Sequence, residues 1–168
     1  AKEHAPDIKL AVFDMDSTLI QCEVIDELAK HAGVGDRVVD ITERAMRGEL
    51  DFNESFTERL GLLNGLDARV AHKIAASLPF SEGAHELMLT LRARGVRTVV
   101  LSVGFDFFAD SVITALKMDE YVANTLEIVD DKLTGRVVPP IVNADEKRAR
   151  LVAIANSMSI DLSQTMAV

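Results

Sequence analysis

The sequence predicts an α/β fold, in which a buried parallel sheet forms a core and a helical cap is inserted into it. Short apolar runs at residues 8–13, 97–102 and 165–168 are separated by segments of helical periodicity, which is typical of strands buried in a parallel sheet. Several helical segments follow one another between the first two runs, whereas a single crossover needs only one helix. Two aspartates stand directly after the first run.

Size and composition limit the kinds of protein to consider. The chain has 168 residues, of which 48% are hydrophobic and 27% charged, and this composition is typical of a globular protein with one core. A net charge of −9 argues against nucleic acid or an anionic membrane as the main partner. No apolar run could span a membrane, residues 1–10 do not form a signal peptide, and the lone Cys22 fits a reducing compartment. We therefore expect a cytoplasmic protein.

Four helices are predicted between the first two strands. The first ends at Gly33 and the second at Gly48, because glycine commonly terminates a helix. Asp51 and Glu54 have the spacing of a capping box at the start of the third helix. Asp67 can cap the fourth. Together these helices are too many for one crossover and indicate a separate cap.

The helices set the expected domain boundaries. We assign residues 23–80 to the helical cap, and residues 1–22 and 81–168 to the α/β core. Ser81 is expected to cap a core helix that precedes the second strand. Farther along, two alternating runs flank the dipeptide at residues 130–131 and predict a hairpin.

The first strand is followed by Phe13-Asp14-Met15-Asp16-Ser17-Thr18. In open parallel sheets the ligand site lies at the carboxyl ends of the strands, so both carboxylates can converge on one reacting group. The alternative is a polar turn in which Asp16 or Ser17 caps the next helix. That reading does not explain Asp14, because an unpaired carboxylate at the end of an apolar strand is costly.

Two further segments carry candidate chemistry. The second strand ends at Leu101-Ser102-Val103-Gly104-Phe105-Asp106, where a hydroxyl and free backbone amides could bind an oxyanion or a phosphate. The alternative is that Ser102 only caps the following helix. Lys147 lies in the first turns of a helix that Asn143 can cap, and its alternative role is that of a solvated surface charge.

Taken together, these parts resemble the haloacid dehalogenase (HAD) superfamily of phosphotransferases, and within it the phosphoserine phosphatase family. The match runs over essentially the whole chain and implies a HAD-type, Rossmann-like core with an inserted cap. The segments that carry the resemblance are residues 14–18 for the first motif, residues 102–106 for the second, Lys147 for the third, and residues 23–29, 41–52, 123–124 and 132–135 for this family in particular.

The resemblance implies a Mg²⁺-dependent hydrolysis of O-phospho-L-serine, the last step of serine biosynthesis. Asp14 would be the nucleophile that forms an aspartyl-phosphate. Asp16 would protonate the departing serine oxygen and later accept a proton from water. Mg²⁺ would bridge Asp14, the backbone carbonyl of Asp16 and the phosphate. Ser102 and Lys147 would hold the phosphoryl oxygens.

The resemblance also assigns roles in the cap. Glu23 would face the substrate ammonium, and Arg59 its carboxylate. Met46 and Phe52 would form an apolar wall that excludes water. The alternatives are a favourable interaction of Glu23 with the helix dipole, an ion pair of Arg59 with a neighbouring glutamate (Glu54 or Glu58), and plain packing of the two apolar side chains.

Two departures from the family pattern bear on function. Val103 stands where the family usually has glycine, next to Gly104 in the phosphate-binding backbone, and we expect weaker phosphate binding or a lower rate unless its backbone stays extended. The sequence also stops before the Gly-Asp-Gly-x-Asn-Asp motif of the family, which supplies a metal carboxylate. We therefore expect a truncated protein in which the C-terminal part of the core is missing.

Three functions remain open at this point. The first is phosphoserine hydrolysis. For this function we expect a small-molecule substrate and no nucleic-acid or membrane partner, while the protein could be a monomer or a homodimer. The second is a HAD phosphatase or phosphotransferase for another small phosphomonoester. The third is a non-catalytic remnant that acts by binding or by self-association.

Overall fold

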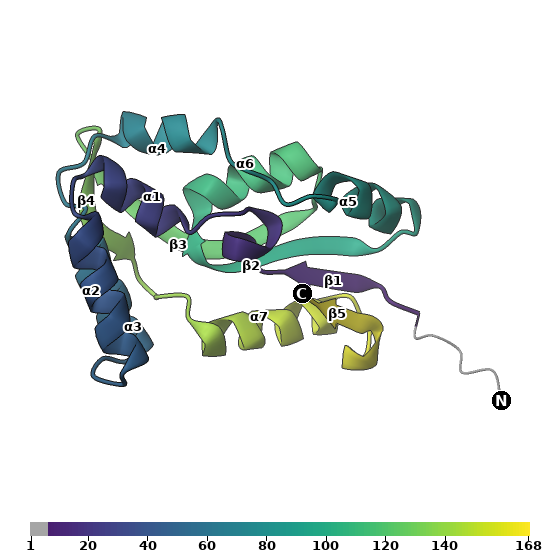
Figure 1. Ribbon diagram of the computed structural model, residues 1–168. Helices are drawn as coiled ribbons and strands as arrows, with labels where there is room; N and C mark the ends of the chain where they lie inside the picture. Colours follow the sequence, from purple (N-terminus) through teal and green to yellow (C-terminus); the bar gives the residue numbers. More distant parts are fainter. Residues whose placement is uncertain (1–6) are drawn as a thin grey trace.

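A computed structural model of the chain describes residues 7–168 and has an α/β architecture built on one five-stranded sheet (Figure 1). The strand order is β4-β3-β2-β1-β5. All neighbouring strands are parallel except the β3–β4 pair, which is the predicted hairpin. The predicted α/β class is therefore confirmed. The strands are β1 (Leu10–Phe13), β2 (Arg97–Phe105), β3 (Glu120–Val129), β4 (Lys132–Val138) and β5 (Thr165–Ala167).

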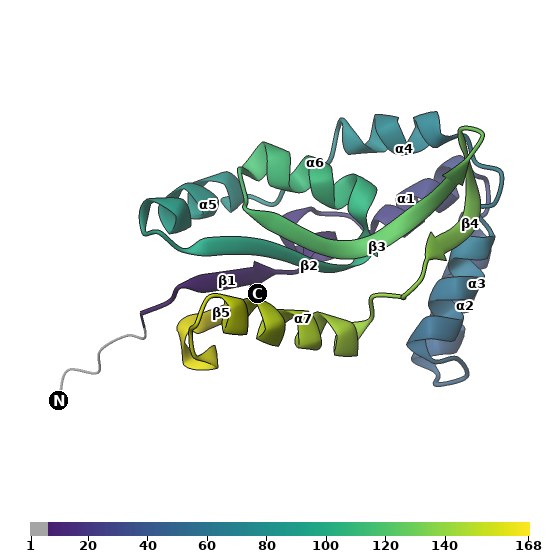
Figure 2. The same cartoon turned by 180° about the vertical axis from the view of Figure 1, so that it is seen from behind.

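Helices cover both faces of the sheet. Helices α5 (Ala84–Ala93) and α6 (Asp106–Leu116) lie on one face, and α7 (Ala144–Ser157) lies on the other (Figures 1 and 2). Alternate residues of β1 pack toward opposite faces, as the pleat of a strand requires. All four β1 residues are buried. This burial on both faces explains why the strand reads as a continuous apolar run. The short 3₁₀ helix η2 (Leu162–Gln164) precedes β5.

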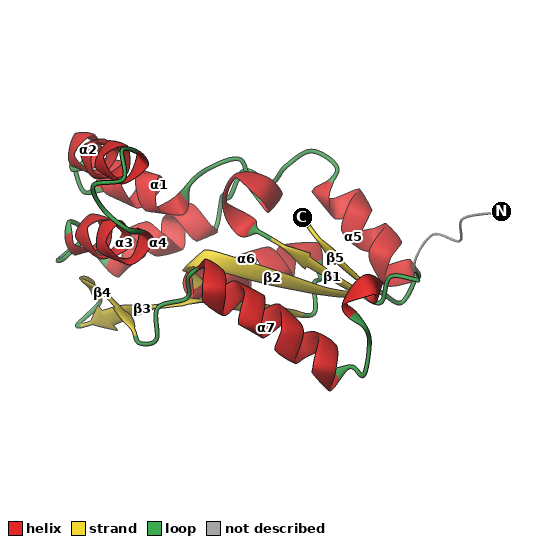
Figure 3. Ribbon diagram, turned by 90° about the horizontal axis from the view of Figure 1, so that it is seen from below, coloured by secondary structure: helices red, strands yellow, loops and turns green. Residues whose placement is uncertain are grey.

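The predicted cap helices gather at one end of the sheet (Figure 3). Asp51 and Glu54 form the expected capping box, and the Asp67 side chain accepts a hydrogen bond from the backbone N–H of Arg69 at 2.9 Å. The predicted N-cap roles of Asp51 in α3 and of Asp67 in α4 are therefore confirmed. The helices are α1 (Val24–His31), α2 (Gly35–Met46), α3 (Phe52–Gly61) and α4 (Ala68–Ala75).

Two backbone seams join this helical group to the rest of the chain. At the first, the segments that enter and leave it pair with each other, because Gln21 N–H donates to the Pro79 carbonyl at 2.8 Å. At the second, Gly65 N–H donates to the Leu133 carbonyl at 2.8 Å, and Leu133 N–H donates to the Leu66 carbonyl at 2.9 Å. The hairpin of β3 and β4 is therefore hydrogen-bonded to the turn between α3 and α4.

The expected cap boundary at residues 23–80 agrees with the position of the first seam but remains a prediction. The part of the expected core at residues 1–6 lies outside the described residues. Within the described part of the chain, no helix has the length and apolar character needed to cross a membrane.

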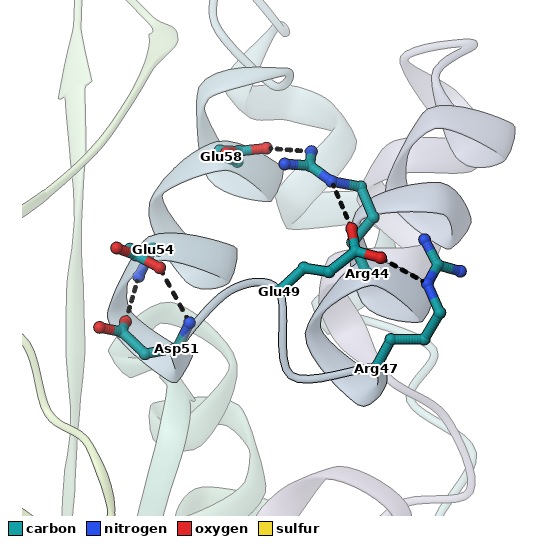
Figure 4. Close-up of polar contacts among 6 residues, drawn as sticks. All are labelled: Arg44, Arg47, Glu49, Asp51, Glu54 and Glu58. Atoms are coloured by element: carbon teal, nitrogen blue, oxygen red, sulfur yellow. Dashed lines mark hydrogen bonds and ion pairs between the residues drawn. The ribbon is translucent and has the colours of Figure 1, made fainter.

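Ion pairs hold the turn between α2 and α3 (Figure 4). Arg44 contacts Glu58 of α3 at 3.0 Å and Glu49 of the turn at 3.6 Å, and Arg47 contacts Glu49 at 2.7 Å. These side chains are partly or largely exposed, so the pairs add little to the stability of the fold.

Two local expectations differ from the structure. Ser81 does not cap α5, because the N-cap of that helix is Gly83. The Ser81 hydroxyl donates instead to the Thr18 carbonyl at 2.6 Å. Strand β3 begins at Glu120, well before the expected hairpin, and its first part pairs in parallel with β2. This part of β3 lacks the alternating apolar pattern that would have indicated a strand.

Candidate active site

Asp14 stands at the carboxyl end of β1, between β2 and β5 in the sheet order. This is the point where successive strands lie on opposite sides of β1, the usual ligand position in open parallel sheets. One carboxylate oxygen of Asp14 accepts a hydrogen bond from Met15 N–H at 2.8 Å, and the other lies 3.4 Å from Nζ of Lys147. The structure thus brings together the predicted nucleophile and the predicted phosphate-binding lysine.

Asp16 follows in the short π-helix η1 (Met15–Leu19), where the left-handed conformation of Ser17 (φ 56°) turns the chain. Its carboxylate accepts a hydrogen bond from Val24 N–H, the first amide of α1, at 3.2 Å. Burial raises the pKa of Asp16 to about 7, and nearby carboxylates including Glu23 and Asp14 add to the rise. Asp16 is therefore a partly protonated acid near neutral pH, and it also stabilises the start of α1.

The phosphate-binding backbone predicted at residues 102–104 belongs to the last part of β2. Ser102 is fully buried, and its hydroxyl oxygen accepts a hydrogen bond from Gly104 N–H at 2.8 Å, which leaves the hydroxyl hydrogen free to donate. The alternative role of Ser102 as a helix cap is wrong, because α6 begins at Asp106 with Phe105 at its N-cap. Val103 belongs to β2, and its effect on phosphate binding remains a prediction.

Gly104 packs directly against Asp16. A Cβ atom at this position would lie 2.8 Å from Oδ2 of Asp16 and 3.0 Å from Oγ of Ser102. Such distances are shorter than real contacts, so only glycine allows the strand end, the hydroxyl and the carboxylate to approach this closely.

A small cavity lies between the core and the cap. Its volume is about 40 Å³, room for only a few water molecules. The side chain of Glu23 at its border accepts a hydrogen bond from the Ser17 hydroxyl at 2.7 Å. The cavity therefore joins predicted residues of the core to predicted residues of the cap. Its lining comprises Asp16, Glu23, Ile25, Phe52, Phe56, Arg59, Val103, Gly104 and Phe105.

Arg59 lies on α3 and is partly buried, which lowers the pKa of its guanidinium, whereas nearby Asp26 and Glu23 oppose this change. Its Nε donates to the Ser55 carbonyl at 3.3 Å. The alternative ion pairs with neighbouring glutamates are not formed within the described residues: Glu58 contacts Arg44, and Glu54 belongs to the capping box. Arg59 is thus a cationic group available to an anionic ligand in the cavity.

The two apolar residues predicted for the cavity wall differ in position. Phe52 lines the cavity and stacks on Phe56, with ring centroids 5.7 Å apart. Met46 does not line it; its side chain is 82% exposed at the end of α2. The sequence analysis did not assign the wall residues Ile25, Phe56 and Phe105. The spacing of four residues from Phe52 to Phe56 was the available signal, because such residues share one face of a helix.

Asp14 and Lys147 line a second depression, which shares no lining residue with the small cavity. It has a volume of about 380 Å³ and is also lined by Thr18, Arg148 and the end of β5. The predicted residues therefore fall into two groups that meet at the turn from Asp14 to Asp16.

The donors at this turn suit a hard cation. Mg²⁺ is usually bound through one or two carboxylates together with waters and substrate phosphate, and the half-exposed carboxylate of Asp14 is a donor of that kind. No cluster of three or more His, Cys, Asp or Glu side chains with metal-binding geometry occurs in residues 7–168. The Asp14 carboxylate is thus a single donor of the kind that a hard cation binds.

Sequence comparison identifies the family. A family description for haloacid dehalogenase-like hydrolases matches residues 11–168. The chain belongs to this family. It is 45% identical over 160 residues to a phosphoserine phosphatase of Archaeoglobus fulgidus. The alignment covers 95% of this chain and 46% of that relative. The chain therefore spans less than half of that curated relative's length.

Solved structures agree with this placement. A phospho-aspartyl intermediate analogue of phosphoserine phosphatase aligns with a TM-score of 0.87 and 38% identity, over 96% of this chain and 77% of the other. A substrate-bound phosphoserine phosphatase complex aligns with a TM-score of 0.87 and 38% identity, over 95% and 76%. The α/β fold expected from the sequence is thus shared with these solved phosphoserine phosphatases.

Proposed function

We propose that this chain is the catalytic region of a Mg²⁺-dependent phosphoserine phosphatase, which hydrolyses O-phospho-L-serine to L-serine and phosphate. The observation that carries the proposal is the placement of Asp14 and Lys147 at one strand end, next to a cavity shared by Asp16, Glu23 and Arg59. The names of the related proteins support the same substrate.

Asp14 is proposed to attack phosphorus. The new bond joins an Asp14 carboxylate oxygen to phosphorus, while the bond from phosphorus to the serine oxygen breaks. Lys147 and the Ser102 hydroxyl bind the phosphoryl oxygens, which reduces the repulsion between two anionic groups. Asp14 and the backbone carbonyl of Asp16 would hold Mg²⁺, which would further neutralise the phosphate charge.

Asp16 is proposed to move the proton in both halves of the reaction. With a pKa raised to about 7 by burial, it can donate a proton to the departing serine oxygen near neutral pH. The resulting carboxylate then accepts a proton from the water that attacks the aspartyl-phosphate and releases Asp14. The apolar wall around Asp16 supports this role by limiting its access to solvent.

The cap residues are proposed to select the amino acid. Arg59 binds the substrate carboxylate and Glu23 binds its ammonium, so a phosphomonoester lacking both groups gains nothing from the cavity. Because the cavity holds only a few water molecules, we expect the cap to open before the substrate enters.

The proposal is tested by phosphate release from L-phosphoserine with Mg²⁺, measured on this chain and on Asp14→Asn. We expect activity in the first and at least a ~10³-fold loss in the second. Equal activity in both would overturn the role of Asp14. Activity on p-nitrophenyl phosphate without activity on L-phosphoserine would favour another small phosphomonoester, and folded protein without activity on either would favour a non-catalytic role.

A further inference from the structure

Strands β2 and β3 do not pair evenly where the proposed phosphate-binding backbone lies. Leu101 pairs with Val122 and Phe105 pairs with Asn124, so three residues of β2 but only one residue of β3 separate the two pairs. Residues 102–104 therefore form a β-bulge. A bulge takes backbone groups out of the regular ladder, so another group has to hold them in place.

The side chain of Asn124 binds this bulge. Its Nδ2 donates a hydrogen bond to the Val103 carbonyl at 2.7 Å. The side chain is only 1% exposed, so water does not compete for this hydrogen bond. The contact fixes the peptide unit between Val103 and Gly104, whose N–H in turn donates to the Ser102 hydroxyl.

The same amide also binds the segment that leads into α7. Nδ2 of Asn124 donates to the Val142 carbonyl at 3.1 Å, and Oδ1 accepts from the Val142 N–H at 2.7 Å. Asn143 follows and caps α7 by accepting a hydrogen bond from Glu146 N–H at 3.1 Å. Lys147 is the next residue of that first helical turn. One buried amide therefore connects the bulge to the helix that carries the lysine.

The chemistry of the three contacts requires an amide. Two backbone carbonyls need donors and one backbone N–H needs an acceptor, and asparagine supplies both from one planar group. A carboxylate would place oxygen against both carbonyls. Burial of a polar side chain is costly without such partners, and only four polar residues of the described chain are buried this deeply: Ser55, Thr98, Ser102 and Asn124.

We propose that Asn124 is a positioning residue whose amide fixes the phosphate-binding bulge relative to Lys147. It does not contact the substrate. It sets the distance between the Ser102 hydroxyl on β2 and the lysine on α7, and through that distance the strength of phosphate binding. The identity of the ligand rests on the proposed function, whereas the connection between the two segments does not.

The test compares Asn124→Asp with Asn156→Asp, which makes the same chemical change at an exposed position of α7. Inorganic phosphate and L-serine are each used as inhibitors of phosphoserine hydrolysis, with Mg²⁺ present. For Asn124→Asp we expect the inhibition constant of phosphate to rise about tenfold, since hydrogen bonds to two carbonyls are lost. The constant for L-serine should stay within about twofold, because Glu23 and Arg59 bind that product from the cap.

Hydrogen exchange of backbone amides supplies a second readout that needs no turnover. We expect residues 102–105 and residues 142–147 to exchange faster together in Asn124→Asp and not in Asn156→Asp. If the aspartate variant does not fold, Asn124→Ala removes the amide without adding a charge and takes its place in both measurements.

The outcomes separate this proposal from the proposed function. Unchanged exchange in both segments, or equal weakening of phosphate and L-serine inhibition, would overturn the positioning role. Joint loosening of the two segments in a chain that does not hydrolyse phosphoserine would overturn the proposed function and still support the connection made by Asn124. Joint loosening with selective weakening of phosphate inhibition supports both.

Discussion

The two sides of the cavity are held by different kinds of interaction. On the core side, two hydrogen-bonded side chains are buried and uncharged, Ser102 at 0% and Asn124 at 1% exposure. On the cap side, the α2–α3 turn is held by charged pairs, and the Arg44 and Glu58 side chains are 34% and 43% exposed. Buried hydrogen bonds are strict in geometry, whereas exposed ion pairs are weak and exchange readily with water.

This difference matches what each side would have to do in the proposed phosphatase reaction. A phosphoryl group in transfer requires donors at fixed positions, and the core side supplies them from backbone and buried side chains. The cap side has to move, because a cavity of about 40 Å³ is too small for an amino-acid phosphate to enter. Substitutions on the core side should therefore affect activity strongly, and those in the cap turn weakly.

Among substitutions outside the proposed nucleophile, the largest effect is expected for Gly104→Ala. The added methyl group would lie against Oδ2 of Asp16 and Oγ of Ser102, and we expect kcat/KM for phosphoserine to fall by at least ~100-fold and the free energy of unfolding by about 1–3 kcal/mol. Gly61→Ala is the matched control, because its Cβ would meet no atom within 4 Å. Steady-state kinetics and thermal unfolding of both variants measure these two effects. Unchanged kinetics in Gly104→Ala would show that the strand end is not closely packed on Asp16.

A smaller effect, on stability, is expected for Asp16→Asn without divalent cations. The pKa of Asp16 is about 7 in the folded state and 3.8 ordinarily, so between these pH values the folded state keeps the proton and the unfolded state loses it. Asp16 therefore lowers the free energy of unfolding as the pH rises from about 4 to 7. We expect Asp16→Asn to be more stable than the parent chain by about 1–3 kcal/mol at pH 8, and equal to it at pH 4.

Urea unfolding at both pH values measures this difference, and Asp110→Asn controls for removal of an exposed charge. The opposite sign, with Asp16→Asn less stable at pH 8, would mean that the carboxylate is stabilised in the fold and is not a buried acid.

The smallest effect is expected in the cap turn. A double-mutant cycle of Arg44→Met and Glu58→Gln should give a coupling energy below about 1 kcal/mol that decreases as salt is added. We expect kcat/KM to stay within about twofold. A coupling energy well above this value, or a large loss of activity, would show that the cap turn is as strictly positioned as the core side.

Much of this arrangement could be predicted from the sequence, because local signals decide it. The short apolar strands, the capping residues Asp51 and Asp67, and the turn of the hairpin all depend on residues near one another in the chain. The candidate site was found through Asp14 and Asp16, whose position after a buried strand has a direct physical meaning.

The remaining features depend on contacts between distant segments, which periodicity does not report. The early, parallel part of β3 is fixed by pairing with β2, and the hydroxyl of Ser81 binds Thr18 rather than its own helix. Phe105 and Phe56 meet in the cavity from different elements. The exposed position of Met46 follows from the path of the α2–α3 turn, which its sequence neighbours do not determine.

The seam between the cap helices and the hairpin has a consequence for synthesis of the chain. A ribosome makes the residues around Gly65 and Leu66 well before Leu133, which supplies both of their backbone partners. A nascent chain that has reached only the end of α4 lacks those hydrogen bonds, and its helices rest on their mutual packing and on the ion pairs of the α2–α3 turn. The cap is thus completed by a strand that is translated after it, and its final stability is acquired together with that of the core.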